Sequence, residues 1–188
     1  MVTRVQARTG FDRRRVLGYT LNDSLRLRTG LAKALGTAPG SVDAWSLGEH
    51  GDMSVPLYSR VRVDGEQVHP TAGQRAIAED YLRNWYVRHV ALDSGRSSTW
   101  TSGLGVARMV TALGGAGELW PASLVLDGEY GVSGVAVTVP VTLGSGGAEQ
   151  IHEWQLGADD LAALHASAEF VRAAAAGVRA PGVRSGGA

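Results

Sequence analysis

The sequence predicts an α+β fold in which long helices pack on an antiparallel β-meander. Amphipathic helical patterns occupy much of residues 22–113 and return near the end of the chain. Residues 122–156 are instead rich in β-branched side chains and are interrupted by turns that contain glycine. Helices and strands therefore do not alternate along the chain, as they would around a parallel sheet. We expect the strands of the meander to pair antiparallel.

The first helix is expected over residues 22–36. Asn22 or Asp23 can cap its N-terminus, and Gly36 can end it in a left-handed conformation. Apolar residues recur on one face of this stretch, which favours packing against a core. Short strands are expected next, over residues 42–48 and 57–70, the second with the turn signal "DG".

A long amphipathic helix is expected over residues 71–92. Ile77, Tyr81 and Trp85 recur at intervals of four, which places them on one face. We expect these aromatic residues in the core or in a contact between subunits. A further helix is expected over residues 98–113.

The second half of the chain is expected to form the meander of about three strands, over residues 122–156. A last amphipathic helix should follow over residues 158–174, with two aspartates in its first turn that favour the helix dipole. The glycine-rich end has no apolar pattern. We therefore expect one domain over residues 1–176 and a flexible tail over residues 177–188.

The composition narrows the range of partners. Eighteen basic residues balance eighteen acidic ones, so the chain has no broad positive electrostatic field that would attract nucleic acid or an anionic membrane. Nowhere do eighteen apolar residues run together, and there is no cysteine for a disulfide or a thiolate site. We expect a cytoplasmic protein that binds neither nucleic acid nor membrane.

Three residues suggest chemistry when they are taken together. Asp23 and Arg26 are three apart on the first helix and so leave the same face, while His50 lies in a turn between Gly48 and Gly51. Separately, the first two could form a surface ion pair, and the histidine could be structural. Together they could bind and convert a 2-oxo or 2-hydroxy acid. The guanidinium of Arg26 would bind its carboxylate, and the imidazole of His50 would donate or accept its proton. The glycines would let a ligand approach the imidazole closely.

Several stretches carry a family resemblance. The segments "VLGYTLNDSLRLR" and "GEHGD" resemble the two signature stretches of the C-terminal catalytic domain of the NAD-dependent lactate/malate dehydrogenase family. The resemblance continues through "ARMVTAL" and "LDGEYGVSGVAVTVPVTLGSGG" and ends in "LAALHASAEFVRAA", so it covers nearly the whole chain in order. One departure is Asn22, which stands where the family usually has an apolar residue before the aspartate.

The resemblance implies roles for four residues. His50 matches the proton donor and acceptor, Asp23 its carboxylate partner, and Arg26 the arginine that binds the substrate carboxylate. Ser98, or equally Thr99, falls near the small hydroxyl residue that lines the substrate pocket. The implied reaction interconverts a 2-hydroxy acid and a 2-oxo acid, with NAD as cofactor. Lactate and malate both stay open as substrates.

The resemblance also implies a second domain that binds the dinucleotide. We expect that domain upstream or in another chain, because "GLGVAR" and "GSGGAE" do not open a βαβ unit. The chain is then expected to be inactive alone and to form a homo-oligomer. The alternative is a non-catalytic binding or oligomerisation remnant of the family. The remaining histidines are too dispersed for a metal site.

Overall fold

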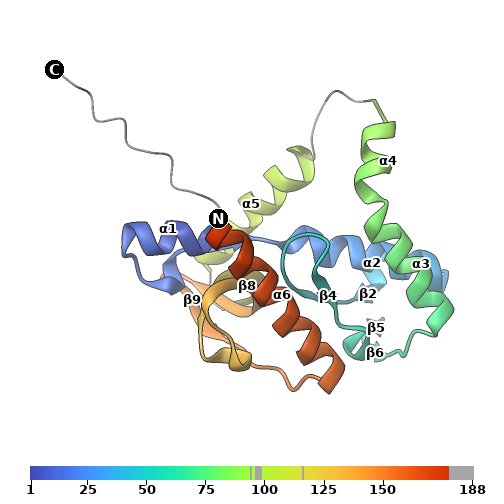
Figure 1. Cartoon of the computed structure of the whole chain (residues 1–188). Helices are drawn as coiled ribbons and strands as arrows, with labels where there is room; N and C mark the ends of the chain where they lie inside the picture. The colour runs from blue at the N-terminus through green and yellow to red at the C-terminus, as the bar shows by residue number, and fades with distance from the viewer. Residues whose placement is uncertain (94, 96–98, 116, 178–188) are drawn as a thin grey trace.

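A computed structural model describes residues 1–93, 95, 99–115 and 117–177 of the chain. The described residues confirm the α+β fold, with helices packed on antiparallel sheets (Figure 1). Of the tail expected over residues 177–188, Gly177 is the last residue of the final helix, and the other residues lie outside the described part. Within the described part, no helix is long and apolar enough to cross a membrane.

The main sheet is built on a long antiparallel hairpin. Strand β7 (Glu118–Asp127) pairs with β8 (Ser133–Gly144) over most of its length, and Val, Leu and Trp side chains alternate into the core. Three short strands and one hairpin partner complete the sheet in the order β1-β7-β8-β3-β4, with β9 paired to β8. Their bounds are β1 Gly18–Tyr19, β3 Ser46–Gly48, β4 Ser54–Pro56 and β9 Gly147–Ile151.

The meander was therefore predicted correctly, but the strand expected over residues 42–48 was wrong as a single strand. Its first part is β2 (Val42–Asp43), which belongs to a small second sheet with β5 (Arg62–Val63) and β6 (Glu66–Gln67). Its second part is β3 in the main sheet. The "DG" turn lies between β5 and β6, where both residues have positive φ, as a tight hairpin of this kind requires.

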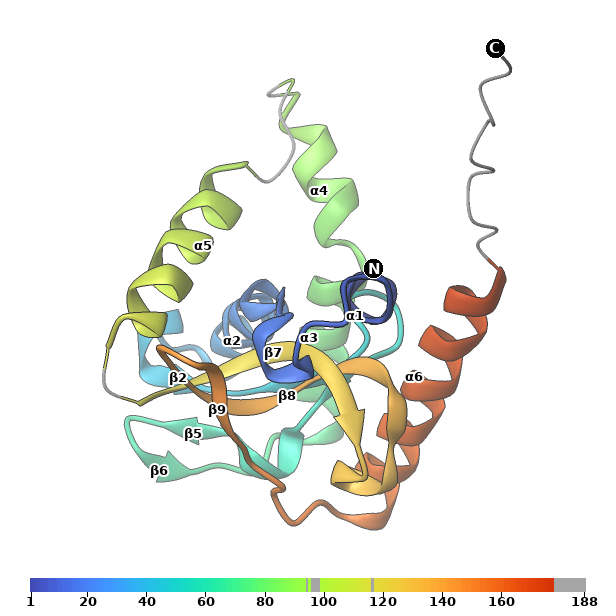
Figure 2. The same cartoon turned by 90° about the vertical axis from the view of Figure 1, so that its left-hand side faces the viewer.

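Six helices surround these sheets in the described part. They are α1 Val2–Thr9, α2 Leu21–Leu35, α3 Ala72–Arg83, α4 Trp85–Ala91, α5 Thr99–Leu113 and α6 Ala158–Gly177. Helix α1 was not predicted; it is short, Val2, Val5 and Ala7 are its only apolar residues, and none of its residues is buried. Figure 2 shows α6 running beside the sheet and α1 lying near the C-terminal end of α6.

The single helix expected over residues 71–92 was also wrong. It breaks at Asn84 (φ −92°, ψ 9°), where the side-chain amide donates to the Asp80 carboxylate at 2.7 Å. The backbone N–H of Asn84 still donates to the Asp80 carbonyl at 3.0 Å, so the ψ of 9° is what ends the regular helix at this residue. The break starts a separate helix, α4, at Trp85.

Two clusters of buried side chains hold the fold together. The larger lies between the main sheet and α6, and the smaller lies between α2, α3 and the small sheet. The smaller cluster includes Leu27 and Leu31 of α2, both fully buried. Helix α2 touches both clusters, so its first turns, in which Leu21, Asp23 and Ser24 are buried, are fixed against the sheet on one side and α3 on the other.

Candidate active site

Helix α2 positions Asp23 and Arg26 one turn apart at its N-terminal end. The helix begins after Thr20, whose hydroxyl donates to the Pro121 carbonyl of β7 at 3.2 Å and fixes the start of α2 to the sheet. The predicted side-chain cap by Asn22 or Asp23 was wrong, because both side chains have other partners. Asn22 accepts a hydrogen bond from the Tyr19 hydroxyl at 2.9 Å and donates to Ser102 of α5 at 3.3 Å.

The turn after β3 presents His50 to Asp23. The His50 Nδ1 and Asp23 Oδ2 atoms are 2.5 Å apart, which leaves Nε2 as the ring nitrogen for another partner. The Asp23 side chain is 12% exposed and the His50 side chain 52% exposed. A buried carboxylate thus orients an imidazole that solvent and ligands can reach.

The glycines beside His50 are also required by the packing of the turn. Gly48 has φ +82°, and a Cβ there would lie 2.6 Å from the Ser167 hydroxyl oxygen of α6. That hydroxyl accepts the Glu49 backbone N–H at 2.7 Å, and Glu49 in turn accepts the Met53 N–H at 3.1 Å. A Cβ at Gly51 would meet the Glu49 carboxylate. The turn is therefore stabilised by the Glu49–Met53 hydrogen bond inside it and by the Ser167 hydroxyl of α6.

The Asp23 contact raises the pKa of His50 above its usual value of 6.5. The main cause is the hydrogen bond to the carboxylate, assisted by the charges of Asp23 and Glu49. Partial burial and the positive charge of Arg26 act in the opposite direction but are smaller together. The imidazolium form is thus more favoured than in a free histidine, which suits a group that delivers a proton.

Arg26 lies beside this pair. Its guanidinium approaches Asp23 Oδ1 at 3.5 Å, too long for a strong hydrogen bond, and stacks over the Trp85 ring with Cζ 3.8 Å from the ring centroid. The Trp85 ring is itself stacked on His89 of α4, with centroids 5.0 Å apart.

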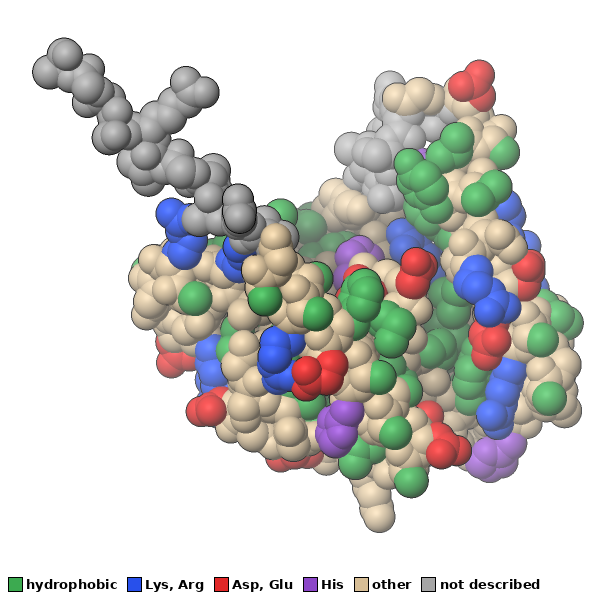
Figure 3. Space-filling view, viewed as in Figure 1, with side chains coloured by type: hydrophobic (Ala, Val, Ile, Leu, Met, Phe, Trp, Pro, Cys, Tyr) green, Lys and Arg blue, Asp and Glu red, His purple; other side chains and the backbone are tan. Residues whose placement is uncertain are grey.

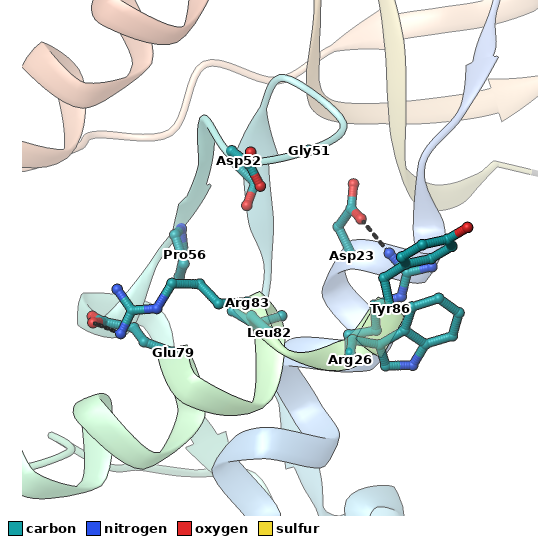
Figure 4. A pocket seen from close by; sticks show the side chains of 11 residues that line it. Asp23, Arg26, Gly51, Asp52, Pro56, Glu79, Leu82, Arg83 and Tyr86 are labelled. Carbon is teal, nitrogen blue, oxygen red and sulfur yellow. Dashed lines mark hydrogen bonds and ion pairs between the residues drawn. The ribbon is translucent and has the colours of Figure 1, made fainter. Parts of the chain in front are cut away.

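Asp23, Arg26 and His50, here called the triad, are bordered by several hollows, of which two are large. The α2–α3 cleft, of about 430 Å³, has Asp23, Arg26, Gly51, Trp85 and Tyr86 among its lining residues (Figure 4). In the space-filling view the surface is hollowed beside the arm formed by α3 and α4 (Figure 3). The α1–α6 cavity, of about 530 Å³, is lined by the imidazole, by residues of α1 and α6, and by β1 with the Thr20 that follows it. The carboxylate and guanidinium face one hollow, and the imidazole borders the other.

The structure thus brings together three of the four predicted residues. Ser98 lies outside the described part of the chain, and Thr99 is the first residue of α5. Two contributors were missed by sequence reasoning. Trp85 is 59 positions from Arg26 with no local signal linking them. Ser167 is a polar residue on the face of α6 that also buries Leu164 and Ala168, a signal that could have been noticed.

Comparison with known proteins shows the family to which the chain belongs. The family model described as lactate/malate dehydrogenase, alpha/beta C-terminal domain, matches residues 20–179. The chain belongs to this family. It is 41% identical to the malate dehydrogenase of Halobacterium salinarum over 165 residues, which cover 86% of this chain and 53% of that relative. It is 35% identical to the L-lactate dehydrogenase of Mesoplasma florum over 180 residues, which cover 92% and 57%.

The fold agrees with that of solved relatives. The malate dehydrogenase from Aeropyrum pernix superposes with a TM-score of 0.86 at 27% identity, covering 95% of this chain and 60% of that one. The chain spans about half the length of the curated relatives it matches. As a dehydrogenase C-terminal domain, its α2 carries the aspartate and arginine of the triad, and the β3–β4 turn carries the histidine.

The two glycine-rich stretches do not form a phosphate site in this domain. "GLGVAR" lies inside α5, and "GSGGAE" spans the hairpin turn from β8 to β9. A dinucleotide fingerprint must lie between a strand and the N-terminus of a helix. In the described part of the chain, no group of three His, Cys, Asp or Glu residues could hold a metal ion.

Proposed function

We propose that this chain is the substrate-binding and catalytic domain of an NAD-dependent 2-hydroxy-acid dehydrogenase of the lactate or malate type. Such an enzyme is an oxidoreductase that interconverts a 2-hydroxy acid and a 2-oxo acid. The observation that supports this most is the 2.5 Å contact between His50 Nδ1 and Asp23 Oδ2, with Arg26 beside it on the same helix. A domain without chemistry to perform has no evident physical need for this triad.

Arg26 is proposed to bind the substrate carboxylate. Its planar fork can donate two parallel hydrogen bonds to two carboxylate oxygens, which fixes the orientation of the neighbouring 2-carbon. The guanidinium makes only a long contact to Asp23, so a substrate carboxylate can replace it at small cost. Both lactate and malate carry the carboxylate that this residue would recognise.

His50 is proposed to move the proton. In the reducing direction the imidazolium Nε2–H donates to the 2-oxygen of the oxo acid, and the electron pair of that N–H bond stays on the ring. Asp23 holds the tautomer through Nδ1 and stabilises the imidazolium charge before the transfer. In the oxidising direction the neutral ring accepts the hydroxyl proton at Nε2.

NAD, when bound, supplies or accepts the hydride at the 2-carbon. The α1–α6 cavity fits the reactive ring of such a cofactor, because it borders the imidazole and is lined mainly by apolar residues and by glycines 18 and 48. The described residues do not fit the dinucleotide phosphates, since neither glycine-rich stretch opens a helix from a strand. We therefore propose that a separate dinucleotide-binding domain completes the site and that the chain is inactive without it.

The proposal includes a homo-oligomer in the cytoplasm. Exposed apolar side chains on α4 and α5 support association of copies; they are Val87, Val90, Leu104 and Val110.

Calorimetric titration with oxamate, an unreactive analogue of a 2-oxo acid, tests the proposal. The wild type should bind it, and Arg26→Ala should lose about 1.5–3 kcal/mol of binding free energy, the usual value of a hydrogen bond to a charged group. Arg28→Ala is the matched control, because Arg28 lies two positions along α2 and pairs with Asp43 at 2.8 Å. Equal heats from the wild type and Arg26→Ala would favour the non-catalytic remnant instead.

A further inference from the structure

We propose that Trp85 is a positioning residue for Arg26: its indole face holds the plane of the guanidinium so that the N–H edge stays open to a substrate carboxylate. This inference rests on the proposed function, since it deepens the carboxylate site of that function.

The stack leaves the recognition edge of Arg26 free for a ligand. The guanidinium Cζ lies 3.8 Å from the ring centroid of Trp85, within the range of cation–π contacts. Such a contact uses a face of the guanidinium, whereas its five N–H donors lie in the plane. A tryptophan in this place can therefore orient the fork without occupying the donors that a carboxylate needs.

The other contacts of Arg26 cannot fix the fork by themselves. The approach to Asp23 is a single 3.5 Å contact, and Asp23 is already bonded to His50 through its other oxygen. An arginine side chain with free torsions must be ordered when a ligand binds, at a cost of about 0.5–1.5 kcal/mol. Stacking on the Trp85 ring orders the Arg26 side chain before a ligand binds, so this entropy loss does not weaken binding.

The fold brings Trp85 to Arg26 through a close crossing of α2 and α3. A Cβ added at Gly30 would lie 3.1 Å from Ala78, so the two backbones approach closely there. Helix α3 then ends at Asn84, and Trp85 starts α4 at the mouth of the cleft. His89, one turn further along α4, stacks on the indole with an interplanar angle of 7° and fixes its plane.

The first test measures the stack without a ligand. Protons above an indole face are shifted upfield, so the Arg26 δ-methylene signals of the wild type should lie upfield of ordinary arginine values. Trp85→Leu should return them to ordinary values, and Trp85→Phe should keep part of the shift. Val87→Ala, two positions along α4 on an exposed side chain, is the matched control and should leave the signals unchanged. Arginine signals unaffected by Trp85→Leu would overturn the inference.

The second test titrates oxamate into the same variants, with thermal unfolding to confirm that each is folded. Trp85→Leu should weaken binding about 2- to 12-fold, which is the ordering cost converted to a dissociation constant. Trp85→Phe should recover most of the loss, because it restores a flat aromatic face. If Trp85→Leu bound oxamate with wild-type affinity, and binding still depended on Arg26, the role of Trp85 would be refuted and the proposed function would not. Absence of oxamate binding in the wild type would refute the proposed function and this inference with it.

Discussion

Removal of the Ser167 hydroxyl should loosen the turn that carries His50. Ser167 is fully buried, and its oxygen accepts the Glu49 N–H at 2.7 Å across the interface between α6 and the turn. Ser167→Ala leaves this N–H without a protein acceptor and opens a space only one oxygen atom in size. An unsatisfied buried donor costs about 1–3 kcal/mol, so we expect that loss in the free energy of unfolding. For a chain of this length, each kcal/mol lowers the melting temperature by about 2–4 °C.

Urea unfolding and amide hydrogen exchange measure this effect. The Glu49 amide should exchange faster in Ser167→Ala than in the wild type, and the unfolding midpoint should fall. Ser145→Ala, in the exposed turn between β8 and β9, is the control and should change stability by less than about 0.5 kcal/mol. Wild-type stability together with wild-type protection of Glu49 would refute the reasoning that α6 holds the turn that carries His50.

Three further predictions concern charge and the core. Asp23→Asn should lower the pKa of His50 in an NMR titration, and should remove a stabilisation that is complete below pH 6.5 and lost as pH rises through the raised pKa of the wild type. Leu31→Ala, at a fully buried position of α2, should cost about 2–5 kcal/mol in urea unfolding. Burial of Glu129 opposes its ionisation, but hydrogen bonds from Arg13 and backbone amides outweigh burial and lower the pKa of Glu129. Glu129→Gln should therefore remove a stabilisation that is present above about pH 4.5 and is lost as pH falls through the lowered pKa. Stability curves of that variant and the wild type that run parallel in acid would contradict this.

Much of the fold could be predicted because its main signals are local. The β-branched run of the meander, the "DG" turn and the apolar face of α2 each depend on neighbouring residues only. The errors have different causes. The helix expected over residues 71–92 is divided at Asn84, whose non-helical ψ interrupts a continuous apolar pattern. Helix α1 is held by a distant contact through Thr3, which accepts the Ala136 N–H of β8 at 3.0 Å.

For the site, too, local arrangements could be predicted from the sequence and long-range contacts could not. Asp23 and Arg26 are neighbours on one helix, so their shared face follows from their spacing. Their meeting with His50 depends on the start of α2 being tied to β7 and on the turn after β3 being tied to α6. The packing requirement at Gly48 could not be predicted, because a Cβ there would meet the Ser167 hydroxyl of α6, which is distant in the sequence.

The central claim is that Arg26 places a substrate carboxylate beside the imidazole of His50. The most direct test is the pKa of His50, followed by the NMR signal of its ring with and without oxamate and assigned with His50→Asn. A bound carboxylate beside the ring stabilises the imidazolium, so oxamate should raise the pKa of His50 in the wild type and leave it unchanged in Arg26→Ala. Oxamate that binds through Arg26 while the pKa of His50 stays constant would contradict the account.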